Sequence, residues 1–224
     1  MARLIERLEL ERVRANVARV RAEIDAAVER SPVPRVGEVE LLAAIKYIRG
    51  EDLPLLAEAG IRLVGENRAQ ELRAKHAVHG ALFEWDFIGQ LQSRRVREIL
   101  PCVRLIHSVA SESALRALER DLSLAGPGLR ILLEVNVAGE PGKAGIEPEQ
   151  LGDFIARSPV PVAGLMTMPP LAADPEASRP YFARLRALAD EHSLGRLSMG
   201  TSQDYLVAVE EGATIVRIGT NLYD

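Results

Sequence analysis

Cysteine and lysine are scarce in this 224-residue chain, and long apolar runs are absent from it. The single cysteine, Cys102, excludes an intramolecular disulfide and any metal site built from several cysteines. The four histidines are scattered without the spacing of metal ligands, so we expect no metal site.

No apolar run approaches the roughly 20 residues that cross a bilayer. The amino-terminal segment MARLIERLEL is too charged for a secretory signal. A formal net charge of −4 provides no basic field for a nucleic-acid backbone. These absences predict a cytoplasmic protein that binds neither a membrane nor nucleic acid.

Lysine is the scarcest of the charged residues. Of 28 basic residues only Lys46, Lys75 and Lys143 are lysines, and the other 25 are arginines. Arginine cannot replace lysine as a nucleophile, because its guanidinium group stays protonated and delocalised. Each lysine is therefore a candidate for a site that needs an amine, although chance retention remains the alternative for any one of them.

The first 34 residues have the pattern of an amphipathic helix. Its apolar positions are Ile5, Leu8, Val13, Val17, Val20, Ile24 and Val28, with charged residues between them. Pro32 and Pro34 are expected to end this helix.

Short β-branched apolar runs then alternate with longer helical patterns. The expected strands are 39–46, 61–65, 85–89, 105–109, 130–137, 162–168, 196–200 and 214–219. Helical patterns include 67–78, 111–124, 148–156, 175–192 and 202–211. Eight such units predict an α/β protein, a (β/α)8 TIM barrel, with 1–224 as a single domain and 1–34 as an extra helix packed on the barrel.

In such a barrel the functional site lies at the carboxyl ends of the strands. The first strand ends in LLAAIK, which places Lys46 at the mouth on the same face as Leu42 and Ala44. An amine between apolar neighbours can lose its proton and form a Schiff base with an aldehyde. A lysine that pairs with a carboxylate or with a substrate phosphate is the open alternative.

The last two strands end in glycines, where a barrel frequently binds phosphate. The amides of Gly200, Gly219 and Thr220 and the hydroxyls of Ser198 and Thr220 are candidates to hold one phosphate dianion. A glycine after a strand often serves only to form a turn. Gly200 and Gly219 together, on adjacent strands, therefore indicate a phosphate site more strongly than either glycine alone. Arg217 is expected one pleat below Gly219, where its charge would disfavour protonation of a pyridine nitrogen.

Long motifs in order along the chain resemble the YggS/PROSC family of pyridoxal phosphate homeostasis proteins, which are related in fold to the amino-terminal barrel of alanine racemase. The motifs are LLAAIK, VGENRAQE, WDFIGQLQ, LIHSV, LEVNVAGEPGKAGI, GLMTMP and LSMGTSQDYLVAVEEGATIVRIGT. The resemblance runs from about residue 38 to the end of the sequence.

This resemblance implies pyridoxal 5′-phosphate (PLP) as the cofactor. It implies Lys46 as the Schiff-base lysine, Asn67 near the cofactor, Arg217 at the pyridine nitrogen, and Ser198, Gly200, Gly219 and Thr220 as phosphate ligands. Met166 and His107 lie on strand ends that could line the ring or belong to the core.

The sequence departs from the family pattern at two places. Tyr47 follows the lysine where a threonine or another small polar residue is usual, and it could alter the pocket edge or offer a phenol. The sequence ends LYD where relatives carry FG and a short tail, which leaves little chain for a carboxyl-terminal helix.

Family members are regarded as homeostasis proteins without established catalysis, and we expect this chain to hold and deliver PLP. No residues are left for the second domain that alanine racemase uses, so we expect a monomer, with PLP-dependent apo-enzymes as possible partners. The alternatives are a weak PLP-dependent racemase with Tyr47 as base, a Schiff-base aldolase acting on a phosphosugar, and a scaffold with a vestigial site. Lys143 could be a second aldehyde acceptor, a phosphate contact or a solvated loop residue.

Overall fold

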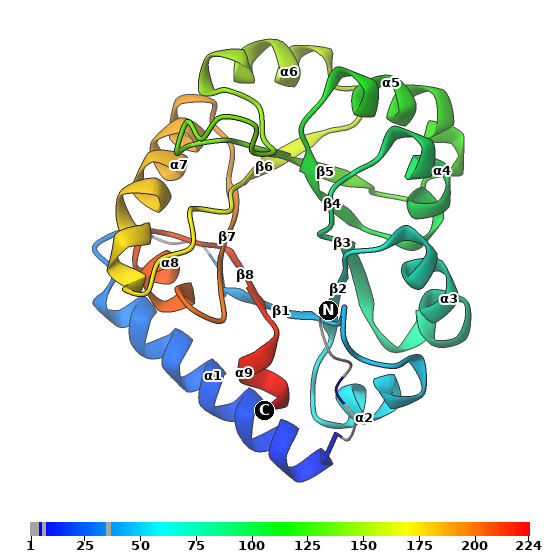
Figure 1. Ribbon diagram of the computed structural model, residues 1–224, viewed down its shortest axis with the longest axis vertical. Helices are drawn as coiled ribbons and strands as arrows, with labels where there is room; N and C mark the ends of the chain where they lie inside the picture. The colour runs from blue at the N-terminus through cyan, green and yellow to red at the C-terminus, as the bar shows by residue number, and fades with distance from the viewer. Residues whose placement is uncertain (1–4, 6–7, 35–36) are drawn as a thin grey trace.

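Eight parallel strands close into a barrel in the computed structural model, which describes residues 5, 8–34 and 37–224 (Figure 1). Each strand pairs with the next one along the chain, and the last pairs with the first. The strands are β1 (Glu40–Ala44), β2 (Leu63–Glu66), β3 (Glu84–Phe87), β4 (Leu105–Val109), β5 (Arg130–Glu134), β6 (Val162–Met166), β7 (Arg196–Thr201) and β8 (Ile215–Ile218). The predicted (β/α)8 barrel is confirmed.

Helices cover the outside of the barrel (Figure 1). They are α1 (Leu10–Arg30), α2 (Leu53–Glu58), α3 (Ala69–His79), α4 (Val96–Ile99), α5 (Glu112–Asp121), α6 (Leu151–Arg157), α7 (Arg179–Glu191), α8 (Tyr205–Glu210) and α9 (Thr220–Tyr223). Helices α2, α4 and α9, of six, four and four residues, have no counterpart among the predicted helical patterns. None of the described helices is both long and apolar enough to span a bilayer.

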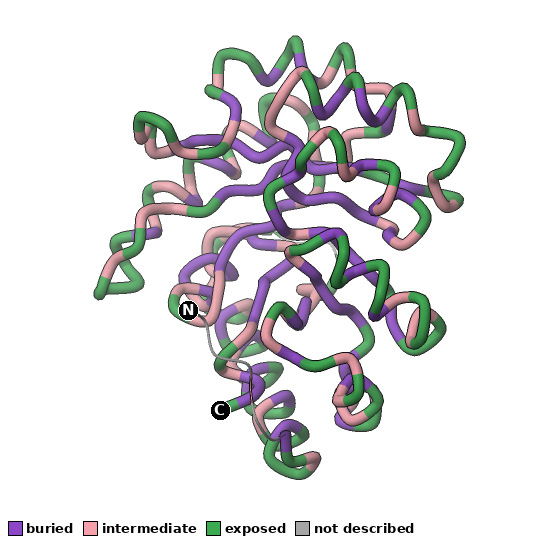
Figure 2. The backbone as a smooth tube through the Cα atoms, turned by 45° about the vertical axis from the view of Figure 1, so that its right-hand side comes forward, coloured by how far each residue is buried: buried purple, intermediate pink, exposed green. Residues whose placement is uncertain are grey.

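The strands separate two apolar layers, because successive side chains point to opposite faces of a strand. Leu42 lies in a small cluster inside the barrel, whereas Ala43 belongs to the larger layer between strands and helices. The inner cluster consists of Leu42, Leu63, Leu105, Leu132, Met166 and Ile215. Figure 2 shows the buried strands at the centre and exposed residues on the outer faces of the helices.

Helix α1 packs outside the barrel, against α8 and α9 (Figure 1). Its buried residues are Val13, Val17, Val20, Ile24 and Ala27, which recur every three or four positions and form one apolar face. The helix runs from Leu10 to Arg30, so the predicted apolar positions Ile5 and Leu8 lie ahead of it, and it ends before the predicted prolines. Residues 1–4 and 6–7 of the predicted helical segment lie outside the described residues.

The short helix α9 is held by side chains of α1. Asn16 Nδ2 donates hydrogen bonds to the carbonyl oxygens of Leu222 at 3.3 Å and Asp224 at 2.9 Å. Arg19 donates to the carbonyl oxygen of Asn221 at 3.0 Å. A helix of four residues, Thr220–Tyr223, does form at the carboxyl-terminal end of the sequence, and α1 supplies contacts that hold it.

Gly164 of β6 pairs with Arg196 of β7. A Cβ atom at this position would lie 1.8 Å from the carbonyl oxygen of Arg196. We therefore expect Gly164→Ala to lower the free energy of unfolding by about 1–3 kcal/mol, because the strands must move apart. Urea denaturation measures the change. Gly195→Ala is the matched control, since a Cβ there meets nothing within 4 Å; equal stability of the two variants would contradict the steric reason.

Candidate functional site

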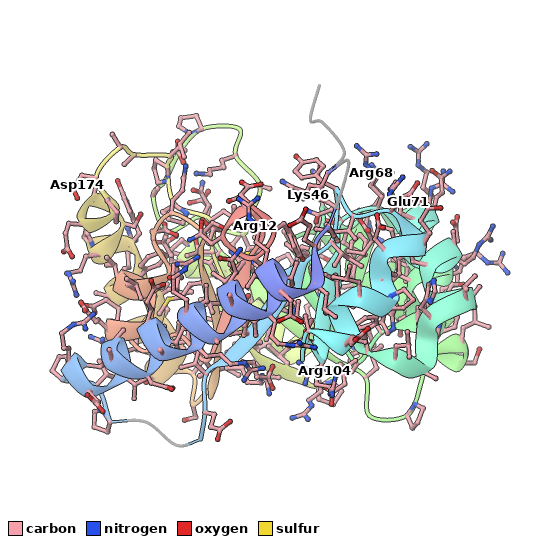
Figure 3. All side chains as sticks on the ribbon, turned by 90° about the horizontal axis from the view of Figure 1, so that it is seen from below. Arg12, Lys46, Arg68, Glu71, Arg104 and Asp174 are labelled. Carbon is pink, nitrogen blue, oxygen red and sulfur yellow. The ribbon has the colours of Figure 1, made fainter. Side chains whose placement is uncertain are left out.

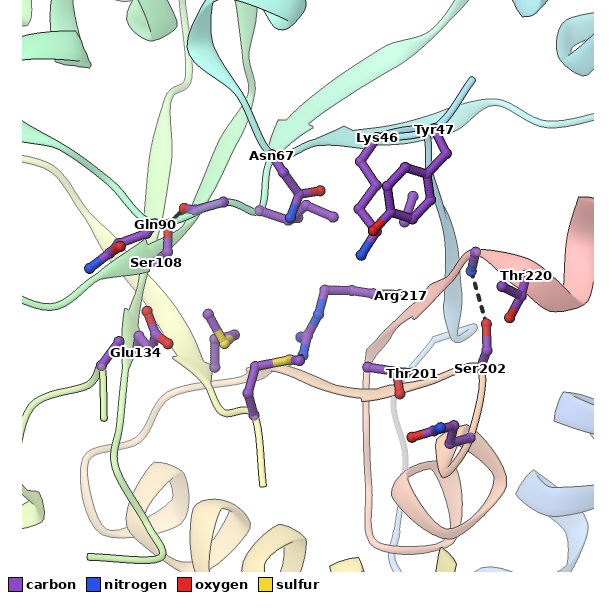
Figure 4. A pocket seen from close by; sticks show the side chains of 18 of the residues that line it. Lys46, Tyr47, Asn67, Gln90, Ser108, Glu134, Thr201, Ser202, Arg217 and Thr220 are labelled. Atoms are coloured by element: carbon purple, nitrogen blue, oxygen red, sulfur yellow. Dashed lines mark hydrogen bonds between the residues drawn. The ribbon is translucent and has the colours of Figure 1, made fainter. Parts of the chain in front are cut away.

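A cavity of about 610 Å³ opens at the carboxyl ends of the strands (Figure 4). Every strand or the loop after it contributes to its wall. In strand order these residues include Lys46, Asn67, Gly89, Ser108, Glu134, Met166, Thr201 and Gly219. The predicted location of the site at this end of the barrel matches the position of the cavity.

Lys46 lies at the rim of this cavity, two residues beyond the end of β1 (Figures 3 and 4). Leu42 on the same face is buried inside the barrel, and Ala44 lines the cavity below the lysine. The side chain of Lys46 is exposed, so the expected enclosure by apolar neighbours is not found. Its Nζ lies 4.6 Å from the centroid of the Tyr47 ring, whose face attracts the ammonium group.

Lys46 differs from the other two lysines in having no carboxylate partner among the described residues. Lys75 Nζ pairs with Glu66 at 2.7 Å, and Lys143 pairs with Glu140. A lysine held in an ion pair is not available as a nucleophile until that pair opens. The structure therefore singles out Lys46 as the free amine of the cavity.

The Lys75–Glu66 pair lies directly behind the cavity wall and was not found from the sequence. Lys75 Nζ also donates to the carbonyl oxygen of Ile45 at 3.0 Å, next to Lys46. Glu66 Oε1 accepts hydrogen bonds from the backbone N–H groups of Asn67 at 2.7 Å and Arg68 at 3.2 Å. The two side chains are 5% and 0% exposed, so this buried pair fixes the β1 end relative to the β2 end.

The predicted phosphate site is only partly assembled in the cavity. Gly219 and Thr220 line it, together with Ser202, whose Oγ accepts a hydrogen bond from the Gly219 N–H at 3.0 Å. Ser198 and Gly200 do not line it. Ser202 was missed by the sequence reasoning, although it lies two residues after Gly200 in the quoted motif GTSQD.

Gly200 has a packing reason to be glycine. Its φ is +89°, and a Cβ there would lie 2.6 Å from Cβ of Ala208 in α8. The backbone turns away from the cavity at this residue and brings Thr201 and Ser202 to the wall instead. The glycine therefore serves the turn that carries the hydroxyl groups.

Arg217 reaches the cavity from β8 and is 6% exposed. Its guanidinium group donates to Ser198 Oγ at 2.5 Å and to the Thr167 carbonyl oxygen at 3.0 Å. Burial lowers its pKa to about 10. Ser198, which is fully buried, thus orients Arg217 from below.

A chain of polar side chains continues from Ser198 through the barrel. His107 Nδ1 lies 2.8 Å from Ser198 Oγ, and His107 Nε2 lies 3.0 Å from Asp86 Oδ2. Asp86 accepts from Arg104, which pairs with Glu40 at the opposite end of the barrel from Lys46 (Figure 3). His107 is fully buried and does not line the cavity, so of the two strand-end residues expected to line a ring only Met166 reaches it.

Burial lowers the pKa of His107 more than its hydrogen bond with Asp86 raises it. As the pH falls, His107 therefore binds a proton in the unfolded chain at a higher pH than in the folded chain. Its contribution to the free energy of unfolding is complete above about pH 6.5 and declines below that pH. We expect the free energy of unfolding to fall between pH 7 and 5 more steeply in the wild type than in His107→Gln. Urea denaturation across this pH range measures both slopes, and equal slopes would contradict the assignment.

Two further polar atoms on the cavity wall have no partner among the described residues. They are the buried Oδ1 of Asn67 and the buried hydroxyl group of Tyr223. Such atoms are costly to bury unless something binds to them. Their presence fits a ligand with both donor and acceptor groups, and Tyr223 belongs to the segment LYD that departs from the family pattern.

The chain is similar to known proteins over nearly its whole length. Residues 8–224 match the family described as "Alanine racemase, N-terminal domain". The "Pyridoxal phosphate homeostasis protein" of Aquifex aeolicus is 40% identical over 220 residues, covering 92% of this chain and 95% of that protein. The protein of the same name from Pseudomonas aeruginosa is 37% identical over 218 residues, covering 93% of each chain. PipY of Synechococcus elongatus, solved with PLP bound, is 31% identical with a TM-score of 0.80, covering 95% of this chain and 100% of that one.

Proposed function

We propose, because this chain belongs to the family of pyridoxal phosphate homeostasis proteins, that it binds PLP as a Schiff base on Lys46 and buffers or delivers the cofactor. The observation that carries the proposal is the unpaired amine of Lys46 in the same cavity as Ser202, Gly219 and Thr220. An aldehyde needs a free amine, and a phosphate needs N–H and O–H donors. This cavity offers both.

The residues of the cavity fit the groups of PLP. The cofactor supplies an aldehyde that condenses with an amine, and Lys46 provides that amine. Ser202, Gly219 and Thr220 would hold the phosphate, with Gly200 and Ser198 supporting them from behind the wall. Arg217 would face the pyridine nitrogen and disfavour its protonation, while Asn67 and Met166 would flank the ring.

An exposed attachment point favours storage and delivery over turnover. Lys46 lies at the open rim, so a bound cofactor remains reachable from solvent. We propose PLP-dependent apo-enzymes of the cytoplasm as the recipients and a monomer as the active form, with residues 1–224 acting as one domain.

The direct test is an absorbance titration of the purified protein with PLP. A Schiff base gives a band at roughly 410–430 nm, a property of the cofactor itself. Borohydride reduction followed by peptide mapping should then place the label on Lys46. Absence of the band, or a label confined to Lys75 or Lys143, would overturn the proposal.

The phosphate end is tested by Ser202→Ala. We expect this change to weaken binding of PLP about tenfold, because the hydroxyl group that would donate a hydrogen bond to the phosphate is lost. Binding of pyridoxal, which has no phosphate, should change little. Equilibrium dialysis measures both ligands. Ser123→Ala removes an exposed hydroxyl outside the cavity and is the matched control; equal losses for the two ligands would place the phosphate elsewhere.

A weak amino-acid racemase is the second candidate, because the Tyr47 ring lies against the Lys46 ammonium group. Loss of α-deuterium from labelled amino acids, abolished in Tyr47→Phe, would support it. Exchange no faster than with free PLP would exclude it. An aldolase would instead bind a phosphosugar and show no pyridoxal absorbance.

A further inference from the structure

The wall of the cavity that lies across from Lys46 is polar and is not used by the proposed PLP contacts at Lys46, Ser202, Gly219 and Thr220 (Figure 4). It is formed at the ends of β3, β4 and β5 by Gln90, Ser108 and Glu134. Gly142 and Ala144, from the loop after β5, line the same cavity. We call this region the Glu134 compartment.

Glu134 is the only buried carboxylate of the described chain whose side chain has no hydrogen-bond or ion-pair partner there. It is 8% exposed and lines the cavity. The buried Glu66 and Asp86, by contrast, each accept at least two hydrogen bonds. Burial of a carboxylate without a partner is unfavourable, so such a group in a cavity points to a ligand that completes it.

The charges around Glu134 indicate the kind of ligand. Burial raises the pKa of Glu134, whereas the charges of Arg217 and Lys143 act in the opposite direction without forming a contact. Arg217 is occupied by Ser198 and Thr167, and Lys143 by Glu140. Neither of these two cations therefore contacts the carboxylate, and no donor among the described residues occupies it.

We propose that the Glu134 compartment binds a small primary amine, whose ammonium group donates to the Glu134 carboxylate. The compartment lies in the same cavity as Lys46, which gives the amine a role if the proposed function holds. A neutral amine could displace Lys46 from a bound aldehyde, because a carbon–nitrogen bond to the amine would form while the bond to Lys46 breaks and Lys46 leaves as its own amine. An ammonium nitrogen has no lone pair until it loses a proton, and the Glu134 carboxylate can take that proton to become a carboxylic acid. Glu134 thus binds the ammonium group and also accepts the proton whose loss makes the amine a nucleophile.

The test measures amine binding without the cofactor. Propylamine is titrated into ¹⁵N-labelled Lys46→Ala protein, and amide shifts of Gln90, Ser108 and Glu134 are followed by NMR. We expect saturable shifts with propylamine and none with propan-1-ol, which has the same shape without the charge. Glu134→Gln on the same background should weaken the binding about tenfold or more, as expected for the loss of a charge-assisted hydrogen bond.

Glu71→Gln is the matched control, because it removes the same charge from the exposed surface of α3 at the same end of the barrel (Figure 3). Its affinity for propylamine should match that of the parent protein. Equal weakening in both variants would mean a long-range charge effect and would overturn the inference, as would binding of propan-1-ol. The failure of this inference is separate from failure of the proposed function, since attachment of PLP to wild-type Lys46 is measured without an amine.

Discussion

Lys46→Ala protein is expected to take up no covalent PLP. Its titration with the cofactor should give no band near that of a Schiff base, and borohydride should leave no label on any peptide. The physical reason is that Lys46 is the one lysine without a carboxylate partner in the described chain, whereas Lys75 and Lys143 are held by Glu66 and Glu140. Labelling should therefore fall from one cofactor per chain to none.

Two matched variants separate the amine from the charge. Lys46→Arg keeps a cation at the rim but cannot form a Schiff base, so it should also remain unlabelled. Lys143→Ala removes a lysine from the loop bordering the cavity and should retain the label. A band that persists in Lys46→Ala and disappears in Lys143→Ala would show that PLP attaches to Lys143, and this result would refute Lys46 as the attachment site.

Lys75→Met is expected to have the largest effect on stability. The change leaves Glu66, which is fully buried, with its charge uncompensated, and it removes the donor to the Ile45 carbonyl oxygen. Breaking a buried ion pair at one partner costs about 3–5 kcal/mol. Urea denaturation of the protein without cofactor measures the loss of unfolding free energy.

The double variant Lys75→Met with Glu66→Gln provides the control. A glutamine carries no charge, and its side-chain oxygen can still accept from the N–H groups of Asn67 and Arg68. The double variant should therefore be more stable than Lys75→Met alone. A single variant within about 1 kcal/mol of wild type would mean that Lys75 is not needed to neutralise Glu66.

The barrel and the position of Lys46 could be predicted because both follow from local patterns. Short runs such as LIHSV can be recognised as strands from their own composition. Eight such runs that alternate with helical patterns are compatible with few folds. The two-residue period of a strand then puts Leu42, Ala44 and Lys46 on one face, an alignment that continues past the end of β1. The exposed state of Lys46 was not predictable, because it depends on where the strand stops.

The rest of the site depends on contacts between residues that no local pattern connects. Lys75 reaches Ile45 across 30 residues, and its partner Glu66 is in β2 rather than on the same helix. Ser202 replaces Ser198 in the cavity because Gly200 turns the chain against Ala208, a close approach visible only in the packed structure. Likewise, Glu134 is one acidic residue among many until its burial and lack of a partner are known.

The polar chain through the barrel restricts which substitutions can accumulate along it. Its members, from Glu40 through Arg104, Asp86, His107 and Ser198 to Arg217, belong to five different strands or their flanking loops, and each is bound to the next. A change at any one member leaves its neighbours with an unmatched donor or acceptor, so a tolerated replacement calls for a second one beside it. Homologous barrels should therefore vary at these positions in concert.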